Sequence, residues 1–152
     1  MQFLNNYSNR ELNIWAELIL DILVSFYFFP KIFPLIIDGQ LYSEALVGII
    51  ATSIILAIVY SIVVFGAINA LTKREEKDER DYIYELKSYR ISYIISQVSI
   101  YLLISLIVFN PINQVRLNEF TAPMIAMLLL IITLLSSTGK SLTQLFNYRR
   151  NI

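Results

Sequence analysis

The feature that most constrains this chain is an apolar segment from Ala45 to Leu71 that carries no charged residue. A helix of that length rises about 40 Å, which exceeds the roughly 30 Å of a bilayer's hydrocarbon core. Apolar runs of more than about 18 residues are typical of transmembrane helices. The whole chain is 57% hydrophobic and 16% charged, whereas soluble domains carry about 25% charged residues. The sequence therefore predicts an all-α integral membrane protein.

Three further apolar segments predict a four-helix transmembrane bundle that forms a single membrane domain over residues 1–152. Ser8 and Glu11 have the spacing of a capping box and place the start of the first helix near Asn9. Pro30 and Pro34 fall in the last third of that helix, where they should kink or loosen it. The expected spans are about 12–37, 45–71, 91–109 and 122–146.

The segment 73–90 holds six of the twelve basic and six of the twelve acidic residues. It contains no glycine or proline, and Thr72 and Glu75 again have the spacing of a capping box. We expect a charged cytoplasmic helix over about 73–90 that leads directly into the third span as an extension of the bundle.

The basic residues are distributed unevenly between the two sides of such a bundle. One side would hold ten of them, and the other side would hold only Lys31 and Arg116. Because cytoplasmic loops are enriched in lysine and arginine, we expect both termini in the cytoplasm. The expected location is a plasma membrane, the inner membrane in a bacterium.

Glu17 and Asp21 lie four residues apart within the first span, so they share one face of the helix. An isolated charge at the centre of a bilayer is unfavourable by about 2.5–3.5 kcal/mol, so we expect either a nearby cation or one protonated carboxyl group. Lys140 is expected at the same depth as Glu17 and is the favoured partner. The alternatives are a structural ion pair, snorkelling to the headgroups, and a proton or cation pathway. Arg90 and Arg10 are the second choices and are expected nearer the interface. Asn69 and Gln97 are further polar candidates at about the depth of Glu17.

The composition of the chain excludes several kinds of catalytic and binding site. The chain has no cysteine and no histidine, so sites built on those residues are excluded. We expect no metal site and no cofactor, because basic residues are interleaved with the acidic ones in the charged segment. The equal numbers of basic and acidic residues there also argue against nucleic-acid binding. An enzyme is the least favoured class.

The start of the third helix has a distinctive pattern of residues, which consists of Asp78, Glu79, Arg80, Asp81, Ile83, Glu85, Leu86, Lys87, Arg90 and Tyr93. This pattern resembles one found in small four-span bacterial and archaeal membrane proteins of uncharacterised function, in which an Asp-Glu-Arg-Asp stretch leads into the third span. The resemblance implies a four-span topology and a recognition surface, and it implies no activity.

Two functions from different classes are expected. The favoured one is a non-enzymatic regulatory, accessory or effector subunit that sits in the lipid bilayer and binds a protein partner at its cytoplasmic face. Its docking candidates are Asp78, Glu79, Arg80 and Asp81, together with the apolar stripe of Tyr82, Leu86 and Tyr89. The alternative is a homo-oligomeric channel or small transporter that uses Glu17 and Asp21, because four spans rarely enclose a pathway alone.

Overall fold

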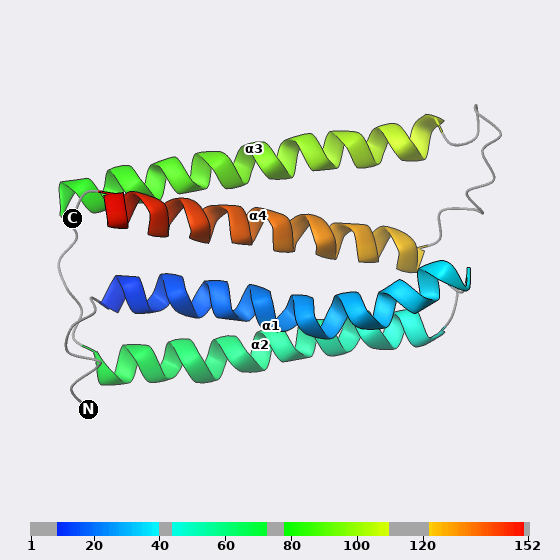
Figure 1. The fold of residues 1–152 in the computed structure, drawn as a ribbon, viewed down its shortest axis with the longest axis horizontal. Helices are drawn as coiled ribbons and strands as arrows, with labels where there is room; N and C mark the ends of the chain where they lie inside the picture. The colour runs from blue at the N-terminus through cyan, green and yellow to red at the C-terminus, as the bar shows by residue number, and fades with distance from the viewer. Residues whose placement is uncertain (1–8, 40–43, 73–77, 110–121, 151–152) are drawn as a thin grey trace.

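The computed structural model describes residues 9–39, 44–72, 78–109 and 122–150. These residues form four helices, which are α1 (Asn9–Ile37), α2 (Glu44–Leu71), α3 (Glu79–Phe109) and α4 (Ala122–Arg150). The helices lie side by side, and α1 begins at the end of the bundle where α4 ends (Figure 1). Each helix is long and apolar enough to cross a membrane. The expected all-helical fold with four candidate spans is therefore confirmed.

Helix α4 is the centre of the arrangement. It packs against α1, α2 and α3, whereas α1 and α2 form a pair of their own. Within the described part of the chain, the backbone of α3 comes close to that of α4 alone. Any link between α1 and α3 must therefore be made by long side chains.

Two apolar clusters hold α1, α2 and α4 together. The larger lies toward the end of the bundle where α1 finishes, and the smaller lies near the start of α1. Tyr60 of α2 adds a polar link, because its hydroxyl donates to the carbonyl oxygen of Ala16 at 3.1 Å. The larger cluster consists of Phe28, Ile32, Leu46, Ile50 and Met127, and the smaller one of Ile14, Leu18 and Leu145.

The side chains that face outward are also largely apolar. Phe26 of α1, Ile62 of α2 and Tyr101 of α3 are 77%, 70% and 67% exposed. A helix of a soluble protein has an apolar stripe toward the core and a polar outer face. Here the apolar surface surrounds the bundle, and many of the polar contacts lie between helices.

Both prolines of the first helix are accommodated inside α1. The helix runs through Pro30 and Pro34 to Ile37 and changes direction toward that end (Figure 1). The amide of Asp38 donates to the carbonyl oxygen of Pro34 at 2.9 Å. The expected N-cap, Ser8, lies outside the described residues.

The prediction for the start of the charged helix is wrong. Asp78 is not helical and α3 begins at Glu79, while 73–77 lie outside the described residues. The amide of Asp78 donates to the Asp81 carboxylate at 3.1 Å, and the amide of Glu79 donates to the Asp78 carboxylate at 2.7 Å. These contacts satisfy amides that a helix start otherwise leaves unpaired. Thr72 closes α2 instead, because its amide and hydroxyl both donate to the Ile68 carbonyl oxygen.

The charged start of α3 is also not a free extension of the bundle. Its first turns lie beside the last turns of α4 (Figure 1). The rings of Tyr84 and Tyr148 meet edge to face, with their centroids 5.4 Å apart. All the helices therefore reach about the same level at this end, which we call the polar end.

Candidate functional site

The polar end contains a bidentate ion pair between α1 and α4. Nζ of Lys140 lies 2.9 and 3.0 Å from the two carboxylate oxygens of Glu17. This is the pairing expected from the sequence, which places Glu17 and Lys140 at the same depth in their spans. The hydroxyl of Ser141 lies 3.4 Å from the same carboxylate, and Nζ lies 5.1 Å from the centre of the Tyr89 ring. The ammonium group therefore has partners from both α1 and α3.

Close packing of α3 against α4 positions Lys140. A Cβ atom on the preceding residue, Gly139, would lie 2.6 Å from Cδ1 of Ile95. One turn away, the hydroxyl of Ser136 lies 2.6 Å from that of Ser92 and 2.8 Å from that of Ser96. Small and hydroxyl-bearing residues are the usual means by which membrane helices approach closely. This seam holds α4 at a depth and rotation that direct Lys140 toward Glu17.

A second network joins α1, α3 and α4 about two turns closer to the end. Arg10 forms an ion pair and hydrogen bond with Asp81. The hydroxyl of Tyr148 donates to the other carboxylate oxygen of Asp81 at 2.6 Å. Asp81 also caps the start of α3. One carboxylate therefore both caps a helix and connects α1, α3 and α4. Asn9, next to Arg10, donates to the Thr72 hydroxyl and so includes α2.

A cleft of about 160 Å³ lies between the two networks. Nη2 of Arg10 is buried near it and has no hydrogen-bond partner among the described residues. Most buried polar groups in proteins do have a partner, which is often an ordered water molecule. The cleft is lined by Arg10, Asn13, Ile14, Glu17, Asp81, Glu85, Tyr89, Lys140, Gln144 and Tyr148.

Asp21 lies one turn deeper than Glu17 and is only 6% exposed. Its hydrogen-bond partner is a hydroxyl of α4, because Oγ1 of Thr138 lies 3.4 Å from Oδ2. No cation is paired with it among the described residues. A second cleft, of about 210 Å³, borders Asp21 and otherwise has mainly apolar walls from α1, α2 and α4.

The remaining polar candidates do not join these networks. Arg90 is exposed and lines a groove between α3 and α4 instead of approaching Glu17. Asn69 is exposed on α2, and Gln97 is half-buried on α3. Arg10, the other alternative partner for the carboxylates of α1, pairs with Asp81.

The docking candidates divide into two groups. Tyr82 and Leu86 are 57% and 72% exposed, and the neighbouring Asp78, Glu79 and Arg80 are exposed as well. Asp81 faces inward, where it serves the second network. Tyr89 is 50% exposed, and one side of its ring faces Lys140.

Sequence reasoning missed the second network. Tyr148 is not among the candidates expected from the sequence, and Asp81 is expected only as part of the docking surface. The missed signal is that the end of α4 and the start of α3 must meet at one level when consecutive helices are antiparallel. Among the described residues, no group of three or more acidic, histidine or cysteine side chains is placed to hold a metal ion.

Comparisons with protein-family models, with curated proteins and with solved structures give no match to this chain. The geometry of the polar end and the exposed surfaces of the helices therefore carry the functional argument.

Proposed function

We propose that the chain is an integral membrane protein that crosses a plasma membrane four times, with its polar end in the cytoplasm. The support is the outward-facing apolar surface of the helices, where Phe26 of α1, Ile62 of α2 and Tyr101 of α3 are all exposed. Soluble monomers rarely expose a contiguous apolar patch of more than a few hundred Å². The uneven distribution of basic residues along the sequence supports the orientation.

Within that membrane, we propose a non-enzymatic regulatory, accessory or effector subunit that binds a protein partner through the start of α3. The observation that carries this proposal is the exposure of Tyr82 and Leu86, at 57% and 72%, on a helical turn whose other face is fixed. Asp81 and Tyr84 hold that inner face against α4. Large apolar side chains presented on a rigid element suit recognition, because little conformational entropy is lost on binding.

The docking surface consists of Tyr82 and Leu86 with the exposed charges of Asp78, Glu79 and Arg80. Tyr82 and Leu86 are four residues apart and therefore lie on one face of the helix. Tyr89 is excluded from the test of this surface, because its substitution would also disturb Lys140.

The test is site-specific photocrosslinking in native membranes, followed by purification and mass spectrometry. Tyr82→Ala with Leu86→Ala should remove the partner bands. The matched control is Tyr101→Ala with Leu102→Ala, which changes the same residue types at similarly exposed positions deeper on the same helix. Retention of all partners in the first variant, or equal loss in both, would contradict docking at the start of α3.

The second candidate is a homo-oligomeric channel or small transporter. The observation that favours it is Asp21, a buried carboxylate that borders a cleft and lies one turn from the paired Glu17. Carboxylates within membranes often mark ion or proton pathways. Flux in proteoliposomes should then collapse in Asp21→Asn and in Glu17→Gln. Unchanged flux in both variants would remove these residues from any pathway.

A further inference from the structure

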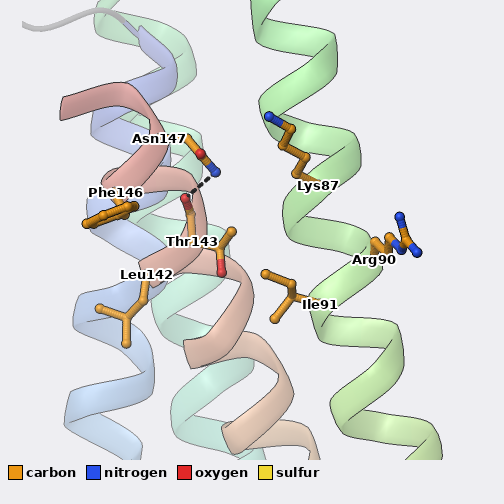
Figure 2. A pocket seen from close by; sticks show the side chains of 7 residues that line it. All are labelled: Lys87, Arg90, Ile91, Leu142, Thr143, Phe146 and Asn147. Atoms are coloured by element: carbon orange, nitrogen blue, oxygen red, sulfur yellow. Dashed lines mark hydrogen bonds between the residues drawn. The ribbon is translucent and has the colours of Figure 1, made fainter. Parts of the chain in front are cut away.

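A groove of about 620 Å³ runs between the start of α3 and the end of α4. Its volume lies within the range of about 300–1,000 Å³ that is common for sites of small organic ligands. Lys87 and Ile91 point from α3 toward α4, and the guanidinium of Arg90 lies on the outer side of α3 (Figure 2). The groove is lined by Lys87, Arg90, Ile91, Leu142, Thr143, Phe146 and Asn147.

The charge of the groove is of one sign. Two of its described lining residues are basic and none is acidic, although the surrounding segment has equal numbers of both. Three acidic residues of this end, Glu17, Asp81 and Glu85, line the cleft between the two networks instead. The groove therefore suits an anionic group.

The walls beyond the two cations are apolar. Leu142 and Phe146 are 52% and 64% exposed along α4, and Ile91 is 40% exposed on α3. The hydroxyl of Thr143 already donates to the carbonyl oxygen of Gly139 at 2.7 Å. A ligand that fits this lining has an anionic head beside Lys87 and Arg90 and an apolar tail along the two helices.

The level of the groove identifies the source of such a ligand. Lys87 and Arg90 immediately precede the uncharged stretch from Ile91 to Phe109. If the chain spans the membrane as proposed above, on which this inference rests, these cations lie at the cytoplasmic headgroups. Basic pockets between helices on that side commonly bind anionic lipid headgroups.

We propose that the groove between α3 and α4 binds an anionic phospholipid of the cytoplasmic leaflet. The lipid phosphate lies beside Lys87 at the rim of the groove, Arg90 flanks it from the outer side of α3, and one acyl chain lies against Ile91, Leu142 and Phe146. The site is lipid-selective, and its rim adjoins the docking surface, because Arg90 lies four residues beyond Leu86 on the same side of α3.

The test places a single tryptophan in the groove. The chain has one tryptophan, so Trp15→Phe with Phe146→Trp leaves the indole on the groove wall. The protein is reconstituted into vesicles in which brominated phosphatidylglycerol or brominated phosphatidylcholine is the quencher in a background of unlabelled phosphatidylcholine. The control is Trp15→Phe with Ile62→Trp, which places the indole on an exposed site of a helix without charge between Ala45 and Leu71.

The groove tryptophan should be quenched at a lower mole fraction of phosphatidylglycerol than of phosphatidylcholine, and the control should show no preference. Each basic residue near an anionic surface contributes attraction equivalent to about a fivefold change in affinity. The two cations together can account for a preference of about 30-fold at most. Lys87→Gln with Arg90→Gln removes both charges and should therefore abolish the preference. Arg80→Gln, an exposed charge at the same end outside the groove, should leave it unchanged.

Equal quenching by the two lipids at the groove overturns the proposal, as does a preference that survives the Lys87→Gln and Arg90→Gln changes. Loss of the preference on addition of soluble glycerol phosphate would also overturn it, because the site would then take a free phosphate. A different result is expected if the chain does not span the membrane at all. In that case neither brominated lipid quenches the groove or the control tryptophan.

Discussion

The ion pair between Glu17 and Lys140 gives the sharpest prediction. Glu17→Gln and Lys140→Met each remove one charge and leave side chains of similar length. Each single variant leaves the other charge between helices without its partner. The double variant removes both charges and leaves no unpaired group.

The burial of the pair sets the expected magnitude. The side chains of Lys140 and Glu17 are 18% and 31% exposed, and both carboxylate oxygens lie within 3.0 Å of Nζ. Fully exposed pairs contribute up to about 1 kcal/mol, whereas removing one partner of a buried pair costs about 3–5 kcal/mol. We expect each single change to lower the free energy of unfolding by about 2 kcal/mol, between those limits. The double change should cost about 2 kcal/mol rather than about 4, which is a coupling of about 2 kcal/mol.

The assay is reversible unfolding of the detergent-solubilised protein by increasing mole fractions of SDS, followed by far-ultraviolet circular dichroism. Lys140→Arg, which keeps the charge, should recover part of the loss. Lys31→Met is the control at the opposite end of α1, where the ammonium contacts the ring of Tyr27, and it should change stability by less than about 1 kcal/mol. Additive single losses, with coupling below about 0.5 kcal/mol, would refute the pairing.

Three further perturbations address the other contacts of the polar end. Tyr148→Phe removes the hydrogen bond to Asp81 and should lower the free energy of unfolding by about 1 kcal/mol; a variant as stable as the parent would show that the bond contributes nothing. Ser136→Ala should cost about 0.6 kcal/mol per lost hydrogen bond, while Ser136→Leu should cost more because it separates α3 from α4, and equal stability of the two variants would contradict the close seam. Asp78→Ala removes the side-chain acceptor of the Glu79 amide and should speed hydrogen exchange of that amide by about fivefold, equivalent to about 1 kcal/mol; unchanged exchange at Glu79 would contradict the capping role.

Length and hydropathy were sufficient to predict the four helices. Each apolar segment is long enough to cross a bilayer as a helix. In an apolar solvent, a helix lets a single segment satisfy its own backbone hydrogen bonds. The partner of Glu17 was also predictable. In antiparallel helices of fixed rise, two residues at equal distances from the middle of their spans lie at the same level.

The start of α3 was predicted less well, because local signals compete there. Thr72 and Glu75 have the spacing of a capping box, and so do Asp78 and Asp81. Distance along the chain does not decide between them. The structure uses Asp81 both to cap α3 and to bind Arg10, a contact between distant segments that no local pattern contains.

Rotation about the axis of α2 was not predictable either. The helix is apolar on every side, so the sequence does not mark the face that packs against α1 and α4. Asn69 is therefore a polar candidate by its depth alone, and the structure places it on an exposed face of α2. On α1 the acidic pair itself marks the inward face, and Asp21 is accordingly buried.

The central claim is a four-span membrane protein with its polar end in the cytoplasm, and cysteine labelling tests it most directly. The chain contains no cysteine, so each introduced thiol is the only reactive one. In intact cells, a membrane-impermeant maleimide should label Asp38→Cys, between α1 and α2, and should label Thr72→Cys only after the membrane is opened. Labelling of both in intact cells, or of Thr72→Cys alone, would contradict the topology.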